Sequence, residues 1–123
     1  MSQAKEFHTL HDPSDGLFRE LAPGLTTRIF SGEHVMLSVV TLAPNSEGVM
    51  HHHPEEQWGV LLEGSAIRYQ GGEQVAVKQG DFWRTLANVP HTMRAGPDGA
   101  RVLDIFSPPR PEYKKPGSGF GST

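Results

Sequence analysis

The sequence contains no cysteine among its 123 residues, which excludes disulfide bridges and thiolate metal ligands. No apolar run approaches the roughly 18 residues that a membrane-spanning helix requires. The first residues, MSQAKEFHTLHD, lack the apolar stretch of a signal peptide. The formal net charge of −3 gives no electrostatic reason to expect binding to nucleic acid or to an anionic membrane. We therefore expect a cytoplasmic protein without nucleic-acid or membrane partners.

Turn-forming residues are abundant instead: 14 glycines and 10 prolines divide the chain into short segments typical of an all-β sandwich or barrel. We expect a barrel over residues 25–110, an irregular N-terminal segment over 1–24 and a flexible C-terminal tail over 111–123. One helical turn is expected over Asp15–Glu20. The expected strands are Leu25–Phe30, His34–Leu42, Gly48–His53, Gln57–Leu62, Ser65–Tyr69, Gln74–Val77, Asp81–Leu86, His91–Arg94 and Arg101–Phe106.

The stretch Val35–Val40 is apolar at almost every position. A strand of this kind has the barrel interior on one side and a further layer on the other. A partner subunit is one source of that layer, so we expect a homodimer.

A histidine cluster carries the main chemical signal. In GVMHHHPEEQWGVLLEG, which spans residues 48–64, His51 and His53 lie two positions apart. On extended backbone they point to one face and His52 to the other. Gln57 follows four residues later, and His91 begins a later expected strand. These four side chains predict a site for one divalent transition metal ion (Zn, Ni, Fe or Mn), because imidazole binds several of these metals.

The same residues resemble the two motifs of the cupin superfamily. Gly48, His51, His53, Gln57 and Gly64 follow the first motif, G-x-H-x-H-x-x-x-E-x-x-x-x-x-x-G, and residues 80–91 follow the second. The resemblance implies a single-domain, double-stranded β-helix (a jelly-roll barrel) with the metal inside its mouth. Three departures concern turns: Leu86 replaces the usual Pro, Asn88 the second Gly and Ala95 the terminal Asn.

One departure concerns the metal. Gln57 stands where most cupins have Glu. Three neutral imidazoles and a neutral carboxamide leave the full positive charge on the ion, which favours Lewis-acid chemistry on a small anionic substrate and opposes redox cycling. The alternative is that Gln57 only terminates its strand.

Within the superfamily, HHHPEEQWGVLLEGS resembles the KdgF-type cupins of pectin and alginate breakdown, which open the ring of 4,5-unsaturated monouronates. The segment GGEQVAVKQGD, Arg84 and the ending Asp104-Ile-Phe-Ser-Pro-x-Arg110 agree with that resemblance. The family's Arg-Glu-Asp run is changed here, because Pro111 follows Arg110 and one acid is absent.

The ending also carries chemistry of its own. Period two places Val102, Asp104 and Phe106 on one strand face, and a carboxylate between apolar neighbours is costly unless it is paired or functional. The resemblance implies proton transfer by Asp104; a structural ion pair with an arginine is the alternative. Arg110 and Arg84 are candidates for binding a substrate carboxylate, and Phe106 for stacking on a sugar ring.

Two other functions fit the same residues. A three-histidine cupin site suffices for an Fe(II)-dependent dioxygenase acting on a small diketone or phenol. A non-catalytic cupin would bind a ligand without turnover. A serine or cysteine nucleophile is unsupported, because cysteine and the G-x-S-x-G motif are absent.

Overall fold

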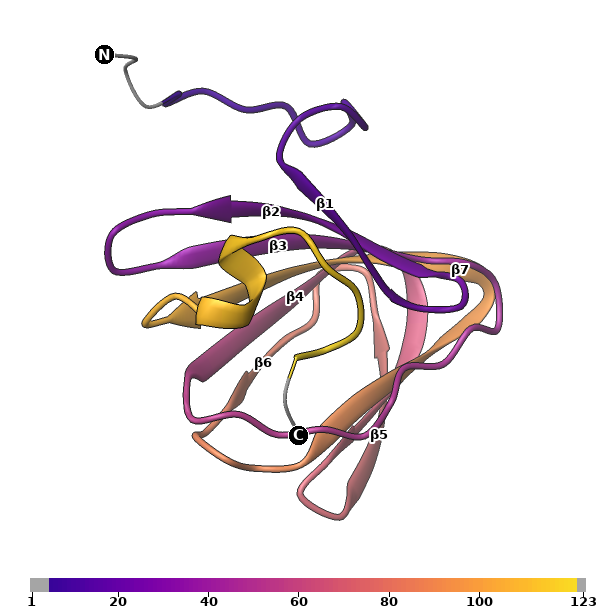
Figure 1. Cartoon of the computed structure of the whole chain (residues 1–123). Helices are drawn as coiled ribbons and strands as arrows, with labels where there is room; N and C mark the ends of the chain where they lie inside the picture. The colour runs from indigo at the N-terminus through magenta and orange to yellow at the C-terminus, as the bar shows by residue number, and fades with distance from the viewer. Residues whose placement is uncertain (1–4, 122–123) are drawn as a thin grey trace.

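The chain is described here by a computed structural model that covers residues 5–121. Its antiparallel strands curl into a barrel, which confirms the all-β jelly-roll expectation (Figure 1). The sheet order is β1-β2-β3-β7-β4-β5, and β6 pairs with β4. The elements are β1 Leu17–Ala22, β2 Leu25–Ser31, β3 Met36–Leu42, β4 Glu56–Gln70, β5 Glu73–Lys78, β6 Phe82–Thr85, β7 His91–Ser107 and the 3₁₀ helix η1 Pro111–Lys114.

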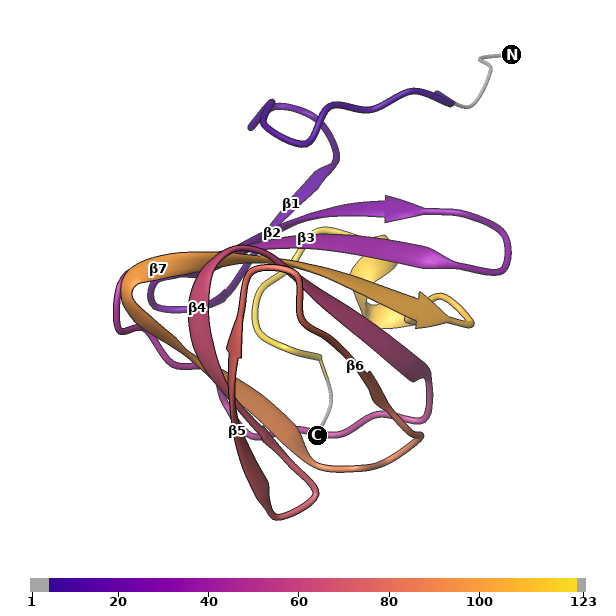
Figure 2. The same ribbon diagram turned by 180° about the vertical axis from the view of Figure 1, so that it is seen from behind.

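Two long strands join the halves of the barrel. The sequence predicted two separate strands in each of these regions, but β4 and β7 run on through the bend, as Figure 2 shows from behind. Their pairing shifts register between Leu61 and Glu63 and again between Gly64 and Ala66. Bulges bend a strand without ending it, so the glycine-containing segments that read as turns are bends within continuous strands.

Two further expectations were wrong. The segment expected as a helical turn leads into β1, where Leu17 pairs with Ile29 of β2. The alternation of apolar and polar residues that indicates a strand is interrupted in this segment, because the charged Arg19 occupies a buried, inward-facing position. Residues 48–53 form only an isolated bridge between His51 and His91 instead of a strand.

The outer face of β3 has a covering layer within the chain itself. Val39 is buried although it lies outside the main core cluster, and it shares a surface hollow with Leu10 and Pro13 of the N-terminal segment. Arg28 holds that segment by donating hydrogen bonds to backbone carbonyls, including that of Asp12 at 2.8 Å. Part of the further layer expected over Val35–Val40 is therefore the chain's own N-terminal segment. The expected homodimer remains a prediction.

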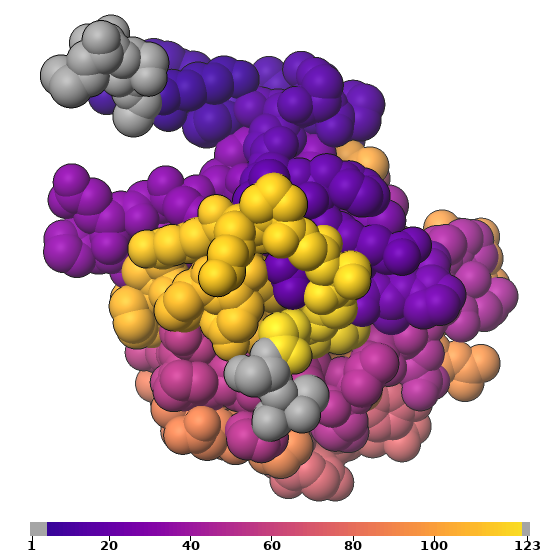
Figure 3. All heavy atoms as spheres, viewed as in Figure 1, coloured from indigo at the N-terminus to yellow at the C-terminus, as the bar shows by residue number. Residues whose placement is uncertain are grey.

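The C-terminal residues lie across the open end of the barrel (Figures 1 and 3). Tyr113 of η1 is buried, and Arg19 donates from all three guanidinium nitrogens to the carbonyls of Glu112, Ser118 and Gly119. We call residues 115–121 the C-terminal strap. The flexibility expected for residues 111–123 remains a prediction, but the described part of this segment is packed against the barrel.

The described residues contain no helix that is long and apolar enough to cross a membrane.

Candidate metal centre

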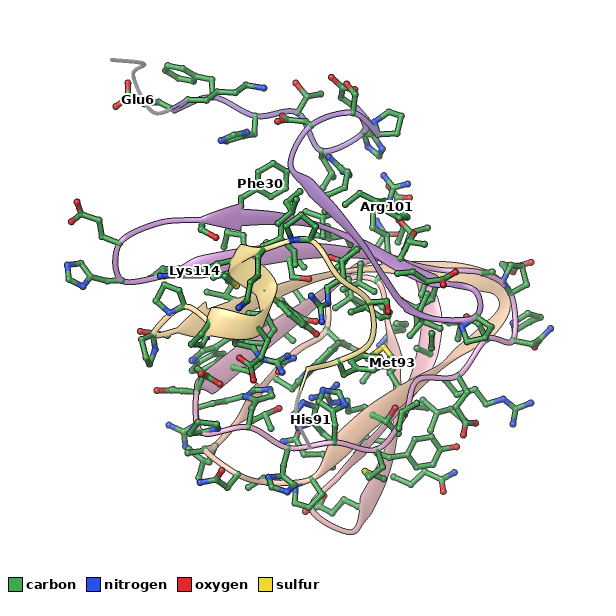
Figure 4. The ribbon with its side chains drawn as sticks, in the orientation of Figure 1. Glu6, Phe30, His91, Met93, Arg101 and Lys114 are labelled. Carbon is green, nitrogen blue, oxygen red and sulfur yellow. The ribbon has the colours of Figure 1, made fainter. Side chains whose placement is uncertain are left out.

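Three histidines converge inside the barrel, as the sequence predicted. His51, His53 and His91 are all buried, and their candidate ligand atoms lie within 4.8 Å of one another. The backbones of His51 and His91 exchange two hydrogen bonds, of 3.1 and 2.9 Å, and these bonds fix His51 against the start of β7. His52 is exposed, so the alternation of faces holds although the segment forms no regular strand. Figure 4 shows His91 in the interior, beneath the strap.

The backbone sets the tautomer of each ring. The Nδ1 atoms of His51, His53 and His91 lie 2.7, 3.1 and 2.8 Å from the carbonyl oxygens of Val49, Glu55 and Val89. A carbonyl only accepts, so each Nδ1 carries the proton and each Nε2 presents a lone pair. The Nε2 of His91 is buried and has no hydrogen-bond partner. Such orientation by a second hydrogen bond is typical of metal-binding histidines.

Burial keeps the three rings neutral. Desolvation, together with the Arg110 guanidinium, lowers the pKa of His51 and of His53 to about 4. Desolvation together with the nearby Arg68 lowers the pKa of His91 to about 2. Metals bind the neutral imidazole, so the rings are held in the ligating form at neutral pH.

Gln57 completes the set from β4. Its Oε1 lies 3.0 Å from Nε2 of His53, and its amide hydrogen-bonds the Asp104 carboxyl and lowers the pKa of that group. The amide nitrogen therefore donates to Asp104, which leaves Oε1 facing a nitrogen that is also an acceptor. Two lone pairs facing each other are unfavourable unless they share a cation. The residues present thus fit a bound divalent ion, with His51, His53, His91 and Gln57 as its ligands.

Asp104 lies beside this cluster on β7, opposite Gly59 of β4 and Ser38 of β3. Burial raises the pKa of its carboxyl to about 6, while Arg68, Gln57 and Arg110 oppose the shift. Its Oδ1 is buried without a hydrogen-bond partner. A carboxyl group with a pKa near neutrality both accepts and donates a proton readily.

Arg110 and Phe106 both line the cavity. The Arg110 side chain is fully buried, with its guanidinium carbon 4.1 Å from the Tyr113 ring centre and its Nε 3.9 Å from Glu55. Its Nη1 has no hydrogen-bond partner. The Phe106 ring meets the His53 ring edge-on at 5.5 Å. The structure therefore brings both residues to the metal cluster.

Arg84 is not brought there. It is exposed and pairs with Trp58 across β4 and β6, with its guanidinium carbon 6.0 Å from the Trp58 ring centre. The neighbouring β6 positions face inward instead: Trp83 packs against the core, and Thr85 is buried and accepts a hydrogen bond from Arg68. A substrate-binding role for Arg84 thus has no support from its position.

Arg68 is the site residue that sequence reasoning missed. It is buried on β4 and lines the cavity, and it donates to Thr85 Oγ1 at 2.9 Å and Gln70 Oε1 at 3.1 Å. Burial lowers its pKa to about 10. Inward residues of β4 have odd numbers up to Leu61 and even numbers from Ala66 onward, because two bulges intervene. Only a correct placement of those bulges would have turned Arg68 inward.

The cavity between these groups has a volume of about 40 Å³. Its polar wall consists of His51, Gln57, Arg68, His91, Asp104 and Arg110, and its apolar wall includes Val40, Val102, Phe106 and Phe120. The arrangement combines a cation site, a carboxyl group near neutrality and two buried guanidinium groups. Such a set suits polarisation and proton transfer on a small oxygen-rich anion.

Comparison with known proteins identifies the family of the chain. The cupin domain family matches residues 38–106. The pectin degradation protein KdgF of Dickeya dadantii (strain 3937) is 26% identical over 98 residues, covering 78% of this chain and 89% of that protein.

Two solved structures share the fold. An RmlC-like cupin from Shewanella frigidimarina NCIMB 400 has a TM-score of 0.78 at 22% identity, covering 92% of this chain and 99% of its own. KdgF from Halomonas sp. has a TM-score of 0.73 at 21% identity, covering 85% of this chain and 97% of its own.

Proposed function

The chain belongs to the cupin domain family, and on that premise we propose that it is a metal-dependent enzyme that opens the ring of 4,5-unsaturated monouronates. The observation that carries the proposal is the convergence of three unprotonated Nε2 atoms and the Gln57 oxygen beside the buried Asp104. The similarity to the pectin degradation protein KdgF supports the choice of substrate class.

His51, His53, His91 and Gln57 would hold the divalent ion. When bound, the ion supplies Lewis acidity that polarises the substrate oxygens and lowers the pKa of a bound hydroxyl group. The four protein ligands carry no charge, so they leave the site attractive to an anionic substrate.

Asp104 is proposed as the catalytic acid and base. Its carboxylate accepts the proton of the anomeric hydroxyl while the bond between C1 and the ring oxygen breaks and its electron pair stays on that oxygen, which gives an aldehyde and an enolate. The same group then gives that proton to C4, and the enolate becomes a ketone. Atoms and electrons balance without a co-reactant. A pKa near 6 suits a group that both takes and gives a proton.

Arg110 and Phe106 are proposed to position the substrate. The Arg110 guanidinium retains an unpartnered Nη1, which is suited to a uronate carboxylate. Phe106 offers an apolar surface beside His53 for the sugar ring. Both residues would contribute to binding rather than to bond breaking.

A direct test combines elemental analysis of the purified protein with an ultraviolet assay of unsaturated galacturonate and guluronate monomers. We expect about one divalent ion per chain and loss of the C4–C5 double-bond absorbance. Full metal occupancy with no consumption of either uronate would refute the proposed reaction while leaving the metal centre intact.

The three-histidine set also favours a second candidate, an Fe(II)-dependent dioxygenase, because imidazole is a good iron ligand. Oxygen uptake by the iron-loaded protein with a diketone or phenol would support it. Full uronate activity with Zn²⁺, which has no redox chemistry, would exclude it.

We also propose that two copies associate through the outer face of the sheet around β4. Trp58, Val60 and Phe82 lie on this face, and two of them are well exposed, at 41% for Trp58 and 67% for Phe82. Ile105 and Leu103 of β7 continue the apolar surface next to them. Sedimentation analysis would show a dimer that Trp58→Asp dissociates; a monomer at all concentrations would contradict the proposal.

A further inference from the structure

The cavity is too small for the proposed substrate as the chain stands. Its volume is about 40 Å³, whereas pockets that enclose small organic ligands measure about 300–1,000 Å³. The space suffices for an ion and little more than a water molecule. A group of the chain that now occupies the substrate's place in the cavity must therefore move before a sugar acid can bind.

Phe120 of the C-terminal strap is what fills it. Its ring stacks on the His51 ring at 4.4 Å between centres and 28° between planes, and it lines the cavity. Gly48 leaves the room that the ring occupies, since a Cβ at that position would lie 3.2 Å from the Phe120 Cζ. An aromatic ring of the chain itself thus covers one ligand of the metal centre.

The backbone beside that ring occupies the anion-binding group. Arg110 donates a hydrogen bond from Nη2 to the Phe120 carbonyl oxygen. Arg110 is also the residue best placed to bind a substrate carboxylate. The Phe120 ring and its carbonyl oxygen resemble a sugar ring and its carboxylate. Phe120 therefore competes with such a substrate for the space beside His51 and for the Arg110 guanidinium.

The attachment of the strap is suited to release. Gly119 and Gly121, on either side of Phe120, have φ angles of +81° and +85°, a conformation that glycine adopts without strain. Residues 115–118 are exposed. The strap is held to β1 mainly through hydrogen bonds, from Arg19 to the Ser118 and Gly119 carbonyls and from the Gly119 amide to Glu20. Phe120 packs against the apolar core, but the exposed residues before it make few buried apolar contacts, and such segments open at low free-energy cost.

We propose that the C-terminal strap is a lid that closes over the metal centre with or without the ion, and that Phe120 is a specificity-determining residue that an organic ligand of the centre must displace. The extension of this proposal to a uronate substrate rests on the proposed function. The control of access to the metal does not.

The first test measures metal exchange in the full-length protein. Association of Co²⁺ is followed by its visible absorbance, and dissociation by transfer to excess dipicolinate. We expect Phe120→Ala to raise both rates by about tenfold or more while the Kd changes by less than about threefold, because a lid that closes over both forms slows entry and exit alike. Phe7→Ala, which removes an exposed aromatic ring from the N-terminal segment, should change neither rate.

Two outcomes would overturn the proposal. Unchanged rates would show that the strap does not control access. A faster dissociation with an unchanged association rate would show that Phe120 merely supports His51 as a ligand.

A second variant locks the lid instead of removing it. Glu20 and Ser118 are bridge partners at exposed positions, and the chain has no native cysteine to interfere. The double substitution Glu20→Cys and Ser118→Cys should, once oxidised, slow both metal exchange rates, and a reductant should restore them. Equal rates in the oxidised and reduced protein would contradict the lid.

The uronate assay separates the two proposals. If Phe120→Ala speeds metal exchange and also lowers the KM for a uronate, the lid covers the substrate position. If metal exchange is faster but no uronate is consumed by either protein, the lid stands and the proposed reaction fails.

Discussion

Two regions of the barrel interior are built on opposite principles. One is a contiguous apolar cluster that includes Leu25, Leu42 and Leu61. The other is the polar set around the three histidines, in which Arg68 and Arg110 are buried, while Oδ1 of Asp104 and Nε and Nη1 of Arg110 have no hydrogen-bond partner. Apolar burial stabilises a fold, whereas buried polar groups cost free energy unless they are paired. The comparison indicates that the first region maintains the barrel, and the cost of the second agrees with the chemical role proposed for it.

Substitutions in the two regions should therefore have opposite effects, and this contrast is the largest that we expect. Leu61→Ala removes a fully buried side chain and should lower the free energy of unfolding by about 2–5 kcal/mol with the metal still bound. His91→Ala should abolish metal binding but leave the stability of the metal-free protein nearly unchanged. Urea unfolding and elemental analysis of each variant measure both properties.

His52→Ala is the matched control, since it removes an exposed histidine one position from two buried ones. Metal content and stability should equal those of the unaltered protein. A large loss of metal in this variant would mean that the faces of this segment are reversed.

Within the polar region, a second substitution separates metal binding from proton transfer. Asp104→Asn keeps the shape of the side chain but removes its ability to exchange a proton. We expect bound metal to be unchanged and kcat for uronate opening to fall by about 10²- to 10⁴-fold. An unchanged rate would reduce Asp104 to a structural partner of Arg68.

How much of this site the sequence revealed depends on the range of the interactions involved. His51 and His53 were placed together by alternation over two residues, and Asp104 and Phe106 by the same rule within one strand. Alternation is local, so it holds wherever the backbone stays extended. The strands on either side of each bend were likewise located from their composition.

Longer-range features were beyond such reasoning. The inward position of Arg68 depends on bulges in β4, and the outward position of Arg84 depends on its pairing with Trp58. Register across strands is set by the whole sheet rather than by the residues nearby. The strap was equally hidden, because its docking depends on Arg19, about a hundred residues earlier in the chain.

The pH dependence of the free energy of unfolding, measured on the metal-free protein, should show the free-energy cost of burying the polar region. The three site histidines have folded-state pKa values of about 4, 4 and 2, below the ordinary histidine value of 6.5, so below pH 6.5 the unfolded chain binds protons that the folded protein does not. The free energy of unfolding should therefore fall as the pH drops from 7 to 4.

Asp104 acts in the opposite direction. Its pKa is raised to about 6, so its contribution to stability is present at low pH and is lost as the pH rises through that value. Three histidines should outweigh one carboxyl group. Urea unfolding at pH 7, 6 and 5 measures the slope, which should be shallower in His91→Ala because that chain has one histidine fewer to protonate on unfolding. A slope that is equally steep in His91→Ala would contradict this account.

The smallest effect that we expect distinguishes two arginines by the direction in which they point. Arg68 faces the cavity, and its positive charge lowers the pKa of the Asp104 carboxyl, whereas Arg84 is exposed on the outer face. Arg68→Gln should therefore raise the pKa of Asp104 further above 6, and Arg84→Gln should leave it unchanged. Carbon NMR of the Asp104 carboxyl in the metal-free protein measures both without reference to any substrate. Equal shifts in the two variants would mean that the bulges of β4 do not turn Arg68 inward, and the polar region would then contain one guanidinium group instead of two.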